Sequence, residues 1–189
     1  MNKLQEIDTF RTDYISQIQD MKSELDDQST QLAAQTNKLT SFNHRLVDSK
    51  KAVIAWTKSF QGHQYLLSHP FWRNVPLADS ICRSLGGYLL ELDDQREFDF
   101  IYNFIKEKQL QEWGVITGMT DGDHDGIWTS RESGKQMTYF NWATGEPNKH
   151  FNAERREDCV HLLKHLNYRM VAQFCQWERW ERFICELET

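Results

Sequence analysis

The segment YFNWATGEPN at residues 139–148 gathers oxygen-bearing side chains around one proline, and EDCV at 157–160 follows it closely. Glu146 and Asn148 flank Pro147, and a cis peptide bond before this proline would direct both side-chain oxygens toward one point. Calcium is a hard cation that takes about six to eight oxygen ligands, so converging carboxylates and amides suit it. The segment therefore predicts a loop built to hold a small ligand or ion.

The cysteines around this loop predict disulfide bonds. They form an even set without any C-x-x-C pair: Cys82, Cys159, Cys175 and Cys185. Zinc sites usually contain such close pairs, so a structural zinc site is not expected. Two disulfides formed in an oxidising, extracellular compartment fit better, although spacing alone leaves three pairings open.

The residues before the loop predict two helices. Asn74-Val75-Pro76 suits a helix start with proline in the first turn, and Gly86-Gly87 suits its end. Asp94–Glu97 reads as a capping box, and the helix after it carries an inward apolar face formed by Phe98, Ile101, Phe104 and Ile105. A short strand is expected over residues 88–92, and only short strand-like pieces and long loops follow Gly114. This pattern indicates an α+β domain over residues 59–189.

Residues 1–58 predict a separate element. They contain no Gly, Pro or Cys and carry no net charge. An apolar heptad with few interruptions predicts a left-handed coiled coil about 80 Å long, and Leu or Ile at most a positions favours a trimer. A helix folded back on its own domain is the alternative. The a positions are Leu4, Arg11, Ile18, Leu25, Leu32, Leu39, Leu46 and Val53, and the d positions are Ile7, Tyr14, Met21, Gln28, Gln35, Phe42, Ser49 and Trp56.

Composition excludes several classes of function. The 189 residues carry a net charge of −6, without the basic face that nucleic-acid binding needs. No apolar run is long enough for a membrane span, and the N-terminus lacks a signal-peptide core, so an extracellular chain is expected to be a mature or trimmed form. No catalytic motif such as G-x-S-x-G, a P-loop or H-E-x-x-H occurs, so an enzyme is not expected.

Four motifs together resemble the C-type lectin-like domains over nearly all of residues 59–189. Residues 116–119 (ITGM) are similar to the family's core strand, 139–148 to its N-W-x-x-G-E-P-N loop, 157–160 to its E-D-C-V strand and 183–186 to its closing F-I-C-E. The resemblance implies two disulfides, Cys82–Cys185 and Cys159–Cys175. A coiled-coil neck before such a head is similar to the collectins and to stalked lectin receptors.

The resemblance also implies a site. Glu146, Asn148 and Glu157 would hold calcium, together with an Asn-Asp pair before the third cysteine, and a mannose-, GlcNAc- or fucose-type sugar would complete the shell. Here Val171 and Ala172 replace that pair. Losing one carboxylate contact weakens calcium binding by roughly tenfold or more. The hypothesis is a secreted, oligomeric, calcium-assisted lectin that serves innate recognition, and the alternative is a degenerate head that binds protein or is structural.

A second acidic segment, DGDHDG at 121–126, fits the EF-hand spacing together with Glu132. Strand-like residues flank it where an EF-hand has helices, so an EF-hand is not expected. The lectin resemblance instead implies an auxiliary calcium site formed by Asp121, Asp125, Glu157 and Asp158. Lys149 stands where the family often has an acidic or amide ligand, and a solvated acidic turn is the alternative.

The remaining aromatic and basic residues are ambiguous. Trp113, Trp128 and Trp142 are expected in the core, and core packing is also the default for Trp177 and Trp180, with sugar or protein contact as the alternative. The pair His161 and His165 is expected to be structural or exposed. Positive charge at residues 149–150 and 155–156 favours an anionic ligand or a solvated loop.

Overall fold

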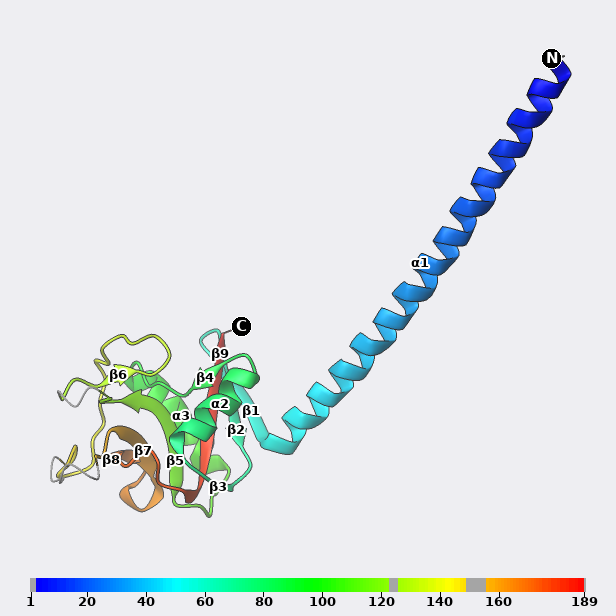
Figure 1. Ribbon diagram of the computed structural model, residues 1–189. Coiled ribbons are helices and arrows are strands. Elements are labelled where there is room, and N and C mark those ends of the chain that lie inside the picture. Colours follow the sequence, from blue (N-terminus) through cyan, green and yellow to red (C-terminus); the bar gives the residue numbers. More distant parts are fainter. Residues whose placement is uncertain (1–2, 123–125, 149–155, 189) are drawn as a thin grey trace. The chain divides into compact units, whose positions relative to one another are not determined.

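The computed structural model describes residues 3–122, 126–148 and 156–188. The chain forms two compact units, Met1–Ser49 and Lys50–Thr189, which are treated separately. The first unit is most of helix α1 (Lys3–Val53), and the second is a head of mixed helices and strands (Figure 1). The α+β class predicted for the head is confirmed.

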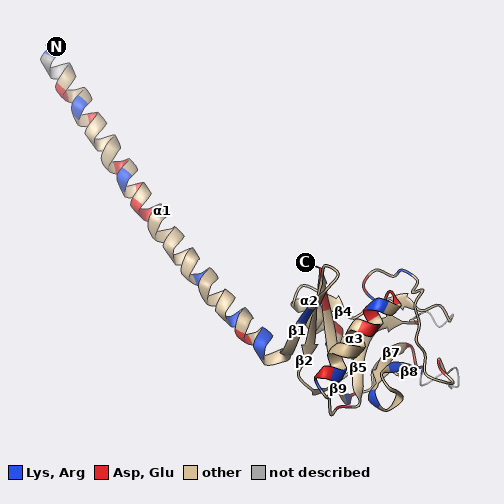
Figure 2. Ribbon diagram, turned by 180° about the vertical axis from the view of Figure 1, so that it is seen from behind, with Lys and Arg blue, Asp and Glu red and all other residues tan. Residues whose placement is uncertain are grey.

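Helix α1 runs unbroken for 51 residues, because no glycine or proline interrupts it. The coloured ribbon in Figure 2 shows that acidic and basic residues occur along its length. Its large apolar side chains are exposed: Ile7, Phe10, Tyr14, Ile15, Ile18, Met21, Leu25, Leu32, Leu39, Phe42 and Val47. Many of them lie on the predicted heptad seam. The helix is therefore compatible with a coiled coil, which stays a prediction.

The boundary between rod and head lies earlier than residue 58. Helix α1 ends at Val53, and strand β1 (Ile54–Phe60) follows at once. Trp56, expected at a heptad d position, instead lies in β1, and its ring is 5.0 Å from the Arg182 guanidinium. The backbone ladder between β1 and β2 (His63–Ser68) and the burial of Ile54 outweigh the helical pattern in these last residues.

One mixed sheet organises the head, in the order β1-β2-β9-β5-β7-β8. Strand β9 (Arg179–Glu188) pairs in parallel with β5 (Gly114–Thr120), and the other strand pairs among the described residues are antiparallel. The remaining strands are β3 (Phe71–Arg73), β4 (Tyr88–Leu89), β6 (Thr129–Ser130), β7 (Cys159–Leu163) and β8 (Arg169–Gln173), and the 3-10 turn η1 (Lys164–Leu166) joins β7 to β8. The strand expected over 88–92 is thus only two residues long, and the strand-like residues 138–140 form none.

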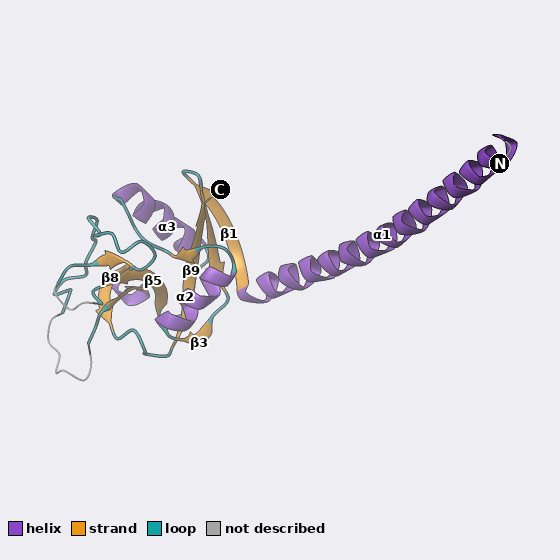
Figure 3. Cartoon of the chain, turned by 45° about the horizontal axis from the view of Figure 1, so that its top comes forward, coloured by secondary structure: helices purple, strands orange, loops and turns teal. Residues whose placement is uncertain are grey.

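The two predicted helices are α2 (Val75–Ser84) and α3 (Gln95–Glu107), as Figure 3 shows. Asn74 caps α2, because its Oδ1 accepts a hydrogen bond from the Leu77 N–H at 3.0 Å. Asp94 caps α3 by accepting from the N–H groups of Arg96 and Glu97 at 2.8 and 2.9 Å. The Glu97 carboxylate accepts a hydrogen bond from the Asp93 N–H, whereas a capping box would use the N–H of Asp94, one residue later.

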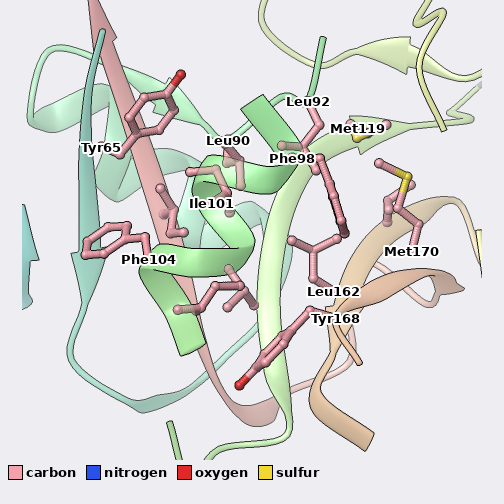
Figure 4. Close-up of a cluster of buried hydrophobic side chains, with 14 of the residues drawn as sticks. Tyr65, Leu90, Leu92, Phe98, Ile101, Phe104, Met119, Leu162, Tyr168 and Met170 are labelled. Atoms are coloured by element: carbon pink, nitrogen blue, oxygen red, sulfur yellow. The ribbon is translucent and has the colours of Figure 1, made fainter. Parts of the chain in front are cut away.

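Side chains alternate across the strands and form two cores. On one face, Leu67, Val115 and Ile184 belong to the same buried cluster as Ile101 and Phe104 of α3. Figure 4 shows Ile101 and Phe104 in this cluster. On the other face, the residues of α2 pack with neighbours of the same strands, and this core contains Leu66, Ala78, Cys82, Ile116, Phe183 and Cys185. Disulfides Cys82–Cys185 and Cys159–Cys175 are both formed, so the implied pairing is confirmed.

Candidate functional site

The Glu146-Pro147-Asn148 turn is tied to strand β8 by one carboxylate oxygen. Glu146 Oε2 accepts hydrogen bonds from the Asn148 N–H at 2.9 Å and from the Ala172 N–H at 3.1 Å. The Glu146 N–H in turn donates to the Ala143 carbonyl at 3.0 Å. The Glu146–Pro147 peptide bond is cis, as the sequence suggested. The loop is thus held against the sheet by main-chain contacts around a half-buried carboxylate.

Glu157 is the second carboxylate of this site. It precedes strand β7 and is half-buried. Burial and, to a smaller extent, the charge of Glu146 together raise the pKa of Glu157 to about 7, and the charge of Arg179 acts in the opposite direction. The structure therefore brings Glu146 and Glu157 close enough to repel each other. A cation placed beside two such carboxylates would relieve that repulsion.

Val171 and Ala172 contribute no side-chain oxygen. Both are buried in strand β8, where Val171 packs with Ala143 and Leu163. The Ala172 N–H is already used by Glu146. Asn167, which could have supplied a replacement oxygen, instead accepts a hydrogen bond from the Tyr102 hydroxyl at 2.9 Å. Two buried apolar side chains, in two different clusters, therefore stand in the place of two expected ligands.

The auxiliary site is brought together only in part. The Asp121 N–H donates to the Asp158 carbonyl at 2.9 Å, and the Thr120 hydroxyl donates to the same carbonyl at 2.7 Å. The Asp121 carboxylate accepts from the Gly126 N–H at 3.2 Å. Asp121 and Asp158 are therefore neighbours, whereas Asp125 lies outside the described residues.

The EF-hand reading is excluded, as expected. Strands β5 and β6 flank the acidic segment, and Glu132, its last EF-hand position, forms an ion pair with Arg83 at 2.7 Å. Within residues 3–122, 126–148 and 156–188, no three His, Cys, Asp or Glu side chains gather closely enough to hold a metal ion. Two carboxylates and one amide fit a calcium ion in part, so further ligands must come from backbone, water or sugar oxygens.

Only some of the tryptophans predicted to lie in the core are found there. Trp128 is buried and Trp142 packs on it with ring centroids 5.0 Å apart, as predicted. Trp113 is 61% exposed, so its assignment to the core is wrong. Its main chain is fixed between the Trp180 carbonyl and the Lys164 N–H, which leaves the ring outside the sheet. Trp177 and Trp180 are also exposed, at 46% and 40%.

The two histidines behave as expected. His161 is buried, and its Nδ1 lies 2.8 Å from Glu181 Oε2. His165 is exposed on η1. Arg179 was not singled out from the sequence, although the run QWERWERF around it shows aromatic and basic residues in alternation.

None of the helices among the described residues is long and apolar enough to cross a membrane.

Comparisons with known proteins agree with this geometry. The sequence model of the lectin C-type domain matches residues 73–187. The perlucin-like protein of Mytilus galloprovincialis is 28% identical over 128 residues, which cover 68% of this chain and 78% of that protein. Collectin-11 of Bos taurus is 28% identical over 152 residues, which cover 80% of this chain but only 53% of the relative. This chain therefore spans about half the length of that collectin.

A solved structure shows the same fold. The carbohydrate-recognition domain of the human scavenger receptor C-type lectin superposes with a TM-score of 0.59 at 22% identity. The superposition covers 70% of this chain and 96% of that domain. At this level of identity the likeness establishes the fold.

Proposed function

The chain belongs to the lectin C-type domain family, and from this premise we propose that it is a calcium-assisted, sugar-binding lectin. Its sugar site is the turn at Glu146 and Asn148 together with Glu157. The observation that carries the proposal is the Glu146 carboxylate, which is fixed by the N–H groups of Asn148 and Ala172 and whose charge acts on Glu157. The order Glu-Pro-Asn is the one found in family members of the mannose, GlcNAc or fucose type.

In the proposed site, some residues hold the ion and the sugar, and others orient those residues. Glu146, Asn148 and Glu157 hold the ion, which when bound supplies a Lewis-acidic centre for the hydroxyl groups of a sugar. The same side chains accept or donate hydrogen bonds to those hydroxyls, so ion and sugar are held by one set of oxygens. The Ala172 N–H keeps the Glu146 carboxylate oriented before the sugar arrives. Asp121, Glu157 and Asp158, with Asp125, would hold a calcium ion at the auxiliary site.

Because two ligands are replaced by Val171 and Ala172, a single head binds weakly. Several heads on one rod raise the apparent affinity through avidity. A homotrimer formed by α1 would supply this arrangement. The two disulfides suit an extracellular protein. In that setting the protein serves recognition of foreign glycans.

Retention on mannan-agarose tests the proposal. The full chain is expected to be retained in millimolar calcium and released by EDTA. Glu146→Gln keeps an oxygen for the two N–H donors but removes the charge, so it is expected to abolish retention while the fold is preserved. Glu188→Gln, an exposed glutamate at the end of β9, is the matched control and is expected to behave like the parent chain. Retention that survives both EDTA and Glu146→Gln would refute the sugar site.

A second candidate function is a head that binds a protein without calcium. The observation that favours it is the burial of Val171 and Ala172 in an apolar cluster, in place of an oxygen-bearing pair. This candidate predicts no calcium-dependent retention on any neutral polysaccharide. The same mannan experiment therefore distinguishes the two candidates.

A further inference from the structure

Two hollows lie side by side on the head, and neither is lined by Glu146, Asn148 or Glu157. One, of about 390 Å³, is lined by Lys106, Gln111 and Lys164 among others. The other, of about 450 Å³, is lined by Gln111, Trp113, Lys164 and His165 among others. Because Gln111 and Lys164 line both hollows, the hollows adjoin each other, and together we call them the basic groove.

The charges that face the basic groove are mostly positive. Lys106, Lys164 and His165 are exposed, and within the described residues none of them has an ion-pair partner. The acidic lining residue Glu112 is buried and forms an ion pair with Arg182 at 2.9 Å, so its charge is compensated. The groove therefore offers a positive surface on a chain whose net charge is negative.

Arg179 extends this surface beyond Trp113. Its guanidinium lies 3.8 Å from the centroid of the Trp177 ring and 6.0 Å from that of Trp113. These aromatic contacts hold the side chain in place. Among the residues that the structure describes, no hydrogen bond or ion pair uses its five N–H donors. A fixed guanidinium with free donors is suited to bind an oxyanion with two parallel hydrogen bonds.

Trp113 connects the guanidinium to the groove. Its ring is exposed, while its main chain is anchored to β9 and to η1 by the Trp180 carbonyl and the Lys164 N–H. A rigid, exposed indole offers an apolar face to the C–H groups of a sugar ring. Apolar stacking and cationic groups thus alternate from Lys106 to Arg179.

We propose that the basic groove and Arg179 bind an acidic polysaccharide, whose sulfate or carboxylate groups pair with Arg179, Lys164 and Lys106 while a ring stacks on Trp113. This second site goes beyond the neutral-sugar site proposed above. It uses none of Glu146, Asn148 or Glu157, so it requires no calcium. Two adjoining hollows and Arg179 offer several contact points, which fits a chain of sugars better than a single monosaccharide.

Binding of the full chain to four polymers in EDTA tests this site. Biolayer interferometry with dextran sulfate, alginate, uncharged dextran and polyglutamate separates charge from sugar. Dextran sulfate or alginate is expected to bind, and which of them binds better identifies sulfate or carboxylate as the preferred anion. Uncharged dextran and polyglutamate are expected to bind at least about tenfold more weakly. Equal binding of polyglutamate, or binding of neither acidic polysaccharide, would overturn the proposal.

Matched variants locate the site on the surface. Arg179→Ala is expected to weaken binding by about tenfold or more, and Lys164→Ala by about two- to fivefold. Lys135→Ala removes an exposed lysine outside the groove and is expected to leave binding unchanged. Equal effects of Lys164→Ala and Lys135→Ala would contradict the assignment. Mannan retention in calcium is measured on the same variants, so a failure of the neutral-sugar site is distinguished from a failure of the groove.

Discussion

At the level of single residues, Tyr65 bridges two buried carboxylates. Its hydroxyl donates to Glu97 Oε1 at 2.6 Å and lies 3.5 Å from Glu186 Oε1, which is also 2.7 Å from His63 Nδ1. Burial raises the pKa of Glu186 to about 8, with a further contribution from the charge of Glu97. Burial likewise raises the pKa of Glu97. Protons held here in the folded state are released when the chain unfolds.

This pair predicts that the head loses stability as pH rises. The unfolded chain releases the Glu186 proton near pH 4.5, whereas the folded chain keeps it up to about pH 8, so the free energy of unfolding falls across that range. Glu186→Gln stays neutral and is expected to reduce the fall. Urea denaturation followed by circular dichroism at about pH 5 and pH 8 measures it. Glu178→Gln, which changes an exposed glutamate, is the control, and an unaltered fall in Glu186→Gln would contradict the prediction.

Ala172 is the residue at which the calcium site can be restored. Ala172→Asp places a carboxylate where the family has one, and it is expected to tighten calcium binding by about tenfold or more. Without calcium the same variant buries an uncompensated charge, so its free energy of unfolding should fall by about 1–3 kcal/mol. Calorimetry and urea denaturation measure the two effects. Ala172→Asn, which adds an oxygen without the charge, is expected to gain less calcium affinity, and equal affinity in both variants would argue against a carboxylate position.

Single residues were predictable where a motif defines them. The charge of Glu146 acts on Glu157, because the Glu146 carboxylate contacts β8 and β8 pairs with β7, which begins two residues after Glu157. Whether the two carboxylates share an ion stays a prediction. The exposure of Trp113 was not predictable, because it depends on main-chain contacts with Trp180 and Lys164, which are distant in sequence. For the same reason the stacking of Arg179 became visible only in the structure.

At the level of elements, helix α3 depends on its N-cap. The Asp94 carboxylate accepts from two N–H groups of the first turn. Asp94→Ala removes this acceptor and is expected to lower the free energy of unfolding by about 1 kcal/mol. Asp94→Asn keeps an oxygen at the same place and is expected to cost only a fraction of this. Urea denaturation of both variants tests the cap, and equal losses would show that charge rather than capping stabilises the helix.

Both head helices were predictable, because caps and apolar spacing are local signals. The start of β1 was not predictable from the sequence. The heptad pattern continues through Val53 and Trp56, yet Ile54–Phe60 forms a strand because β2 lies beside it. Pairing between strands depends on residues elsewhere in the chain. The heptad pattern, which is local, therefore extended the helix to residue 58, whereas it ends at Val53.

At the level of the whole molecule, the exposed apolar stripe of α1 predicts self-association. Leu25 and Leu32 are both 65% exposed and occupy heptad a positions. Analytical ultracentrifugation of the parent chain is expected to show a trimer. Leu25→Asp with Leu32→Asp would place charges in the seam and is expected to give a monomer with a folded head. Ser23→Asp, at a heptad f position, is the control and should stay trimeric, whereas a monomeric parent chain would refute the coiled coil.

The proposed lectin function depends on whether an ion binds beside Glu146 and Glu157 although Val171 and Ala172 supply no side-chain oxygen. Calorimetric titration of the full chain with calcium measures this directly. The expected result is saturable binding at millimolar calcium or below that is lost in Glu146→Gln and retained in Glu188→Gln. An absence of saturable binding, or equal binding by the parent chain and Glu146→Gln, would contradict the calcium-assisted site.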